Sequence, residues 1–238
     1  MKTFLSIDWD YFIDATAYER AMMFPDGGNE NLPDFLLDLI WISRYEGSIR
    51  AAEHRMEMRR ITDIGVLEKE LQLLTDYLEE RGLRAVVAES HREAHDLFLS
   101  HLSAKEKFNL VNIDFHHDLY KNRAGIVDCG NWISELLSAK RINELTWVAR
   151  SDSGELPKLH DKNKYITVTD DLGAVLSAMD EPDCVFICRS GVWSPPHLDE
   201  RLNELIIKAD AEPLFDRYTK EFKEEVKNIS KQINDLLK

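Results

Sequence analysis

Acidic side chains and histidines recur in two short motifs, each at the end of an apolar run. The first motif covers residues 6–10 (SIDWD) and the second covers residues 114–118 (DFHHD). In an extended strand, residues two apart point to the same side, so the acids of the first motif would project together, and so would Asp114, His116 and Asp118. Converging carboxylates repel one another unless cations neutralise them. The spacing therefore predicts a metal site built from both motifs.

A third apolar run, Arg84–Ala88, is followed by His91, which adds an imidazole to this set. Ligand sites of open α/β sheets lie beyond the carboxyl ends of the strands, where all these residues fall. The six candidate metal ligands are Asp8, Asp10, His91, Asp114, His116 and Asp118. Four carboxylates suit two divalent ions, and the oxygen-rich set favours Mn²⁺ over Zn²⁺. Two such ions would activate water as a nucleophile at neutral pH.

The evidence for metal differs between the motifs. A lone Asp-x-Asp is common at loop ends, and a lone histidine that opens a helix is more often a cap or a surface residue. Asp-x-His-x-Asp directly behind a buried strand is more specific, because burying such charges without a counter-ion costs several kcal/mol per group. The prediction of metal therefore depends most on residues 114–118.

Short apolar runs alternate along the chain with longer amphipathic segments. The runs are rich in Val and Ile and show little polar alternation, which is typical of strands buried on both faces of a mostly parallel sheet. The expected strands are Thr3–Ile7, Arg84–Ala88, Leu110–Ile113, Thr146–Ala149, Tyr165–Val168 and Cys184–Cys188. The expected helices are Ile64–Arg81, His91–Leu102, Trp132–Ala139 and Leu172–Ala178. This order predicts an α/β fold with three layers, α/β/α.

The length of 238 residues suits a single domain over residues 1–238. Within residues 25–60, Asp34–Ser43 is expected to be helical, and Ser48–Arg60 is either a solvated helix or a lid over an active site. Residues 214–238 are expected to form an amphipathic helix. That helix either docks on its own domain or forms a subunit interface in a homo-oligomer.

Composition limits the classes of partner. The net charge of −14 argues against nucleic acid and anionic membrane surfaces, and it is compatible with a cationic substrate. Cys129, Cys184 and Cys188 lack zinc-ribbon spacing and are expected to be reduced thiols. No apolar run approaches the ~20 residues of a membrane span, and the N-terminus has no signal-peptide core. These features predict a cytoplasmic protein.

The motifs resemble those of the arginase and agmatinase ureohydrolases. Residues 114–118 resemble their Asp-Ala-His-x-Asp motif, residues 6–10 their Ser-x-Asp-x-Asp motif, and residues 87–91 (VAESH) a degraded form of their Gly-Gly-Asp-His strand end. The resemblance implies that one manganese ion is held by His91, Asp114, Asp118 and Asp8. It implies that the second is held by Asp114, His116, Asp8 and Asp10. The related deacetylase branch uses one zinc ion and a histidine pair that is not evident here.

The order of the motifs differs from that of these enzymes, in which Ser-x-Asp-x-Asp comes last, so the resemblance implies a circularly permuted arginase-like domain. The chain is most similar to an arginase-like family of uncharacterised proteins with a downstream Asn-Trp and a late Arg-Ser strand end, here Asn131-Trp132 and Arg189-Ser190. Some bacterial members are peptide arginases that act on ribosomally made precursor peptides. The implied activity is manganese-dependent conversion of peptidyl-arginine to peptidyl-ornithine and urea.

The resemblance also assigns roles around the ions. Asp118 would relay a proton to the departing amine, and His117 would assist by orienting a ligand. Asn131 and Trp132 would line the substrate pocket, with a place on the core face of its helix as the alternative for Trp132. Arg189 would either bind peptide carbonyls or form a structural ion pair. The acid that grips the guanidinium group would be one of Glu53, Glu57 and Asp128.

One departure keeps other functions open. Free arginases carry a histidine after their Gly-Asn pair, whereas Ile133 stands at that position here. The alternatives are a small-molecule ureohydrolase, a metal-dependent deacetylase, and a catalytically inactive arginase-like binding module.

Overall fold

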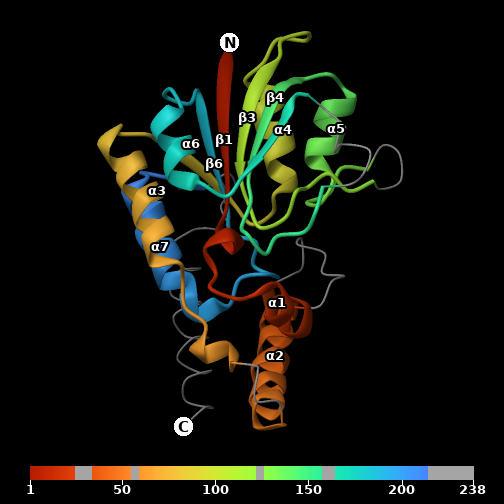
Figure 1. The fold of residues 1–238 in the computed structure, drawn as a ribbon, viewed down its shortest axis with the longest axis vertical. Coiled ribbons are helices and arrows are strands. Elements are labelled where there is room, and N and C mark those ends of the chain that lie inside the picture. The colour runs from red at the N-terminus through yellow and green to blue at the C-terminus, as the bar shows by residue number, and fades with distance from the viewer. Residues whose placement is uncertain (25–33, 55–58, 122–125, 157–163, 214–238) are drawn as a thin grey trace.

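The computed structural model describes residues 1–24, 34–54, 59–121, 126–156 and 164–213, with the side chains of residues 34–35 and 50–54 excepted. Its centre is a seven-stranded sheet in the order β5-β4-β3-β1-β6-β2-β7 (Figure 1), in which every neighbouring pair is parallel. The strands are β1 (Lys2–Asp8), β2 (Ala85–Ala88), β3 (Phe108–Ile113), β4 (Ile142–Val148), β5 (Ile166–Thr169), β6 (Cys184–Cys188) and β7 (Glu212–Pro213). The predicted α/β/α fold is confirmed.

Helices cover both faces of this sheet. One face carries α3 (Glu68–Glu80), α6 (Leu172–Ala178) and α7 (Asp199–Lys208), and the other carries α4 (Arg92–Ser100) and α5 (Trp132–Ser138). The division follows from right-handed crossovers. Chain connections that move along the sheet from β1 toward β7 place their helices on the first face, and those that move toward β5 place theirs on the second.

The central strand β1 is buried on both sides. Leu5 and Ile7 face the core beneath α3 and α7, whereas Phe4 stacks on Phe98 and Phe108 on the opposite face. Full burial of one such side chain stabilises the fold by about 1.5–3 kcal/mol. The strand that ends at Asp8 is therefore held rigidly from two directions.

Helix α3 is shorter than predicted at its start. Residues before Glu68 are extended, because Val66 bridges to Ile13 and the Leu67 amide donates to the Phe12 carbonyl at 2.7 Å. The predicted stop is confirmed, since Gly82 adopts a φ of 59° directly after the helix.

The helices α1 (Ala17–Met23) and α2 (Asp34–His54) lie beyond the carboxyl end of the sheet (Figure 1). Helix α2 extends well past the expected Asp34–Ser43. Its Trp41 and Tyr45 are buried, and Trp41 Nε1 donates to the Gly191 carbonyl at 2.7 Å. The stretch from Ser48 to His54 continues this helix, in keeping with the helical one of its two expected alternatives, and residues 55–58 lie outside the described residues.

Several further elements had no counterpart among the expectations: α1, α7, β7 and the short 3₁₀ helices η1 (Trp9–Phe12), η2 (Ile61–Asp63) and η3 (Pro196–Leu198). The start of α1 is marked by a capping box between Thr16 and Glu19, a signal present in the sequence. The predicted helix over residues 214–238 lies outside the described residues.

Candidate metal centre

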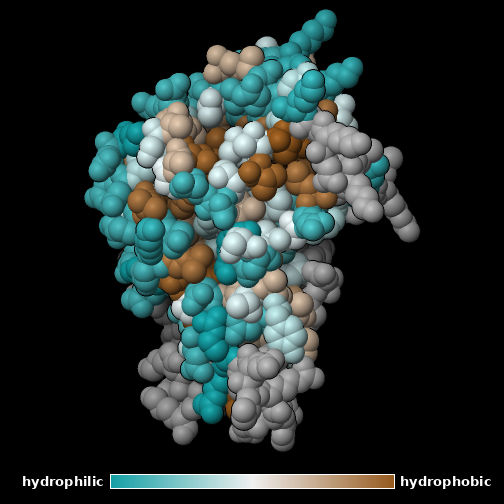
Figure 2. All heavy atoms as spheres, in the orientation of Figure 1, coloured by the Kyte–Doolittle hydropathy of each residue, from teal (hydrophilic) through white to brown (hydrophobic). Residues whose placement is uncertain are grey.

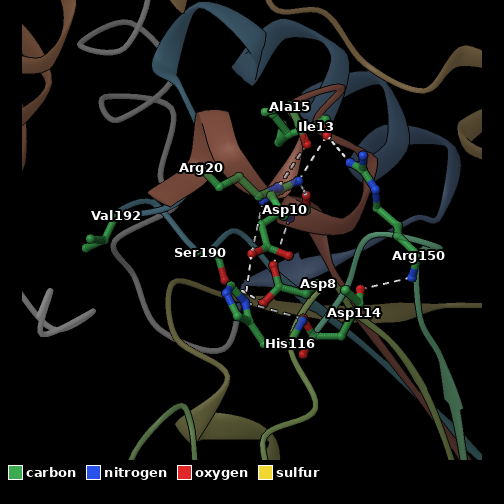
Figure 3. Close-up of polar contacts among 12 residues, drawn as sticks. Asp8, Asp10, Ile13, Ala15, Arg20, Asp114, His116, Arg150, Ser190 and Val192 are labelled. Atoms are coloured by element: carbon green, nitrogen blue, oxygen red, sulfur yellow. Dashed lines mark hydrogen bonds and ion pairs between the residues drawn. The ribbon is translucent and has the colours of Figure 1, made fainter. Parts of the chain in front are cut away.

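The carboxyl ends of β3, β1 and β2 bring all six candidate ligands together, with β6 lying between β1 and β2. The sequence predicted that the ligands converge because residues two apart in an extended strand point to the same side. That explanation was wrong, because these residues do not alternate along strands. Asp8 ends β1 and Asp10 belongs to η1, while residues 114–118 form a loop in which Asp118 has a φ of 49°. Apart from Asp8, the backbone outside the strands sets the direction of these side chains, and Figure 3 shows Asp8, Asp10 and His116 pointing toward one another.

His91 lies at the centre of the first ligand group. Its Nδ1 is 3.1 Å from an oxygen of Asp8, 3.3 Å from one of Asp114 and 3.2 Å from one of Asp118. A single N–H cannot point at three oxygens at once. Neighbouring ligands of an octahedral ion with bonds of about 2.2 Å are separated by roughly 3 Å, which is the spacing seen here.

The second ligand group comprises Asp10, His116 and Asp114, whose ligand atoms all lie within 4.8 Å of one another. His116 Nδ1 is 3.1 Å from Asp10 Oδ2 and 3.9 Å from Asp114 Oδ1. Asp114 belongs to both groups, so its two oxygens can bridge two ions. The two groups share Asp114 as the family resemblance implies, but Asp8, implied as a second shared ligand, is not part of the group of Asp10, His116 and Asp114.

Burial and mutual repulsion perturb the ligands strongly. Burial, reinforced by the charges of Asp10 and Asp114, raises the pKa of Asp8 to about 6. Burial and the Asp118 charge raise the pKa of Asp114 to about 7. Burial lowers the pKa of His91, but the surrounding carboxylates outweigh it and the net pKa lies well above the ordinary value. Protein groups alone therefore leave this charge incompletely balanced.

Asp10 provides the clearest test of whether ions fit. Its carboxylate is fully buried, and neither oxygen accepts a well-formed hydrogen bond from a described residue. Burial alone would raise its pKa, but the charges of His116, 3.1 Å from Oδ2, and of Arg20, 3.6 Å from it, outweigh burial and lower the pKa of Asp10. A buried carboxylate without such bonds is costly unless a cation binds it. The donor set, four carboxylates and two imidazoles, therefore fits two divalent ions.

Residues behind the ligands fix their orientation, as partners of metal ligands commonly do. Ser6 Oγ lies 2.8 Å from His91 Nε2, Ser190 Oγ donates to Asp8 Oδ2 at 2.6 Å, and Trp132 Nε1 donates to Asp118 Oδ2 at 2.6 Å. The sequence analysis gave no orienting role to Ser6 or Ser190. Both serines lie in motifs that the sequence marks, Ser6 in the first motif and Ser190 in the Arg-Ser strand end.

Trp132 and Asn131, predicted to line a substrate pocket, are both fully buried. Trp132 instead holds a ligand. The Asn131 side chain accepts from the Asp128 amide and donates to the Ile126 carbonyl, each at 2.8 Å. Asp128 Oδ1 accepts from the Gly130 amide at 3.1 Å. Asn131 and Asp128 thus stabilise the loop before α5, and Asn131 cannot reach a ligand unless that loop opens.

His117, expected to orient a ligand, contacts its own loop and strand β4. Its Nδ1 accepts a hydrogen bond from the Leu119 amide at 2.9 Å, and its ring packs against Tyr120 and Trp147. Trp147 in turn donates to the Asp114 carbonyl at 2.9 Å. These contacts make His117 a support of the second motif's loop.

Arg189 forms the structural ion pair that was one of its two expected roles. It is buried, and it donates to Glu89 at 2.9 Å and to Asp199 at 2.7 Å. Glu53 lies in α2, but its side chain lies outside the described residues, as does all of Glu57.

His116 marks the open side of the cluster. Its side chain is 28% exposed, whereas those of the other five ligands are 6% exposed or less. Its ring lies 5.5 Å from that of Trp193, in the segment after β6. A substrate would therefore approach past His116 and Trp193.

Figure 2 shows hydrophilic side chains over most of the visible face, with hydrophobic ones in separate groups. In the described part of the chain, no helix combines the length and apolar character needed to cross a membrane. No family model matches the chain, and neither a curated protein nor a solved structure matches it.

Proposed function

We propose that this chain is a dinuclear manganese hydrolase that cleaves the guanidinium group of arginine within a precursor peptide. The observation that carries the proposal is Asp114, which is shared by two ligand groups at the carboxyl end of the sheet. His91, Asp8, Asp114 and Asp118 would hold one ion, and Asp10, His116 and Asp114 the other, with Asp8 as a second bridge. When bound, the ions would supply Lewis-acid activation of water at neutral pH.

The overall reaction adds the oxygen of water to the guanidinium carbon and breaks the bond from that carbon to the side-chain nitrogen. Urea leaves, and a proton must reach the amine that remains on the peptide. Asp118 is the candidate for this transfer, because Trp132 holds its carboxylate facing His91 inside the cluster. His116 and Trp193 would border the entrance through which the arginine side chain reaches the ions.

The preference for peptidyl over free arginine rests on the family resemblance and on Ile133. Free arginases carry a histidine at this position, but Ile133 is fully buried in the core beneath α4 and α5. No proton shuttle can act from there. The same observation favours the second candidate, an inactive binding module, which would bind ions without turnover.

Two measurements test the proposal. Elemental analysis of the manganese-loaded protein should give two ions per chain. Mass spectrometry of an arginine-containing peptide incubated with this protein should show a loss of about 42 Da per converted residue, with urea released. Asp114→Asn should lose both ions, whereas Asp96→Asn, the same change at an exposed acid on α4, should keep both.

A protein that takes up no manganese would contradict the proposal, and two bound ions without any turnover would favour the binding module. Urea from free arginine would identify a small-molecule enzyme, and acetate from an acetylated substrate a deacetylase.

A further inference from the structure

We infer that Arg20 is a positioning residue that holds Asp10 ready for the second ion without occupying the oxygens that would bind it. This inference rests on the proposed function, because it concerns the group formed by Asp10, His116 and Asp114.

Arg20 reaches back from α1 to the turn that follows β1 (Figure 3). The side chain is buried, and one terminal nitrogen donates to the carbonyls of Asp10 at 2.5 Å and Ile13 at 2.9 Å. Its Nε donates to the Ala15 carbonyl at 3.3 Å. A single guanidinium group thus fixes the backbone within η1 and just after it, and with it the place of Asp10.

The remaining terminal nitrogen faces the Asp10 carboxylate at 3.6 Å from Oδ2. This separation gives electrostatic attraction but exceeds hydrogen-bonding distance. Neither Asp10 oxygen accepts a well-formed hydrogen bond from a described residue. Arg20 therefore stabilises the ionised carboxylate while its lone pairs stay available to a cation.

Arg20 also contacts the loop that carries the other two ligands of this group. Its Cζ lies 4.0 Å from the centre of the Phe115 ring, and Phe115 separates Asp114 from His116 in the chain. Arg150 Cζ lies 5.5 Å from the same ring, and Arg150 donates to the Ile13 carbonyl at 2.5 Å. The two arginines connect the loop after β1 to the loop after β3. Arg20 therefore contacts both the segment that carries Asp10 and the loop that carries Asp114 and His116.

The test compares manganese stoichiometry, affinity and electron paramagnetic resonance spectra in four proteins: the unaltered chain, Arg20→Met, Arg20→Lys and Arg59→Met. Arg59 is the matched control, because it binds Glu19 of α1 at 2.8 Å and Asp14 at 3.0 Å, and neither of these residues is a candidate ligand. We expect two coupled ions in the unaltered chain and in Arg59→Met. We expect Arg20→Met to keep one ion, with the spectrum of isolated Mn²⁺, and to bind the second at least tenfold more weakly. Arg20→Lys should recover part of that loss.

The outcomes separate the inference from the proposed function. An unaltered chain that binds no manganese overturns both. Two ions in the unaltered chain and an unchanged second affinity in Arg20→Met overturn the inference alone, as does an equal loss in Arg59→Met. Arg20→Lys no better than Arg20→Met would overturn the role given to charge. If Arg20→Met does not fold, Phe115→Leu provides the same comparison, and it should weaken the second ion selectively.

Discussion

At the residue scale, binding of the proposed first ion would depend on the orientation of the His91 ring. Ser6 Oγ contacts Nε2 from behind, and Nδ1 then faces three carboxylates. Because Ser6 and Asp8 point to the same side of β1, one strand sets both a ligand and the orientation of its neighbour. This coupling explains why a serine two residues before the first acid matters to the site.

Replacing Ser6 with alanine should weaken binding of the first ion by about 10–100-fold, the usual effect of removing a partner of a metal ligand. Titration calorimetry with Mn²⁺ would measure it. Ser134→Ala is the control, because the buried Ser134 hydroxyl has no hydrogen-bond partner among the described residues. Equal affinities in the two variants would contradict the role given to Ser6.

At the element scale, the segment after β6 must pass close to the ion pair between buried Arg189 and partly exposed Glu89. A Cβ on Gly191 would lie 1.9 Å from Glu89 Oε1 and 2.0 Å from an Arg189 terminal nitrogen. The same segment carries Ser190, which holds Asp8, and is anchored by Trp41 of α2. Packing of α2 therefore helps to fix the position of the candidate ligand Asp8 through this segment.

Gly191→Ala should lower the free energy of unfolding by roughly 1–3 kcal/mol, because the methyl group forces the ion pair apart. Gly47→Ala, within α2 and with nothing within 4 Å of the added Cβ, should raise it by roughly 0.5–1 kcal/mol. Urea unfolding of both variants checks the opposite signs. A neutral Gly191→Ala would show that this segment moves freely.

The contact between α2 and η3 should make stability depend on pH. His197 Nδ1 forms a hydrogen bond with Tyr45 Oη at 2.5 Å, and its Nε2 lies 2.9 Å from the Ile64 carbonyl. Burial lowers the pKa of His197 below its ordinary 6.5. Below pH 6.5 the unfolded chain therefore binds a proton at His197 that the folded protein does not bind. The stability that His197 contributes falls as the pH drops below 6.5. His197→Gln should flatten this part of the unfolding free energy measured from pH 7.5 to pH 5.5, and an unchanged slope would contradict the assignment.

At the scale of the whole molecule, the net charge of −14 and the buried acids oppose folding in the absence of cations. Ions that bind only the folded protein stabilise it by mass action. Free Mn²⁺ at a hundred times the dissociation constant contributes about 2.7 kcal/mol per ion.

Removing metal with a chelator should lower the melting temperature by roughly 5–10 °C per ion, and Mn²⁺ should restore it. Calorimetry of the stripped and reloaded protein measures this change. Asp114→Asn should melt at the same temperature with and without Mn²⁺, because it removes the shared ligand. A stripped wild-type chain with an unchanged melting temperature would count against a metal centre.

Local pattern was sufficient for most of the fold. The apolar runs that became β1 and β6 were readable because strands buried on both faces lack polar alternation, and Gly82 ended α3 as its type predicts. Helix α1 was missed, although its capping box between Thr16 and Glu19 is a signal that the sequence carries.

The sequence by itself determined which residues can bind metal, because the chemistry of a side chain and its place at the end of an apolar run are local properties. Only the tertiary structure decided how they meet and what supports them. Ser190 and Asp8 are 182 residues apart, and Arg20 reaches Asp10 through a turn. Such contacts depend on strand order and loop conformation, which arise from packing of the whole chain and which no short segment encodes.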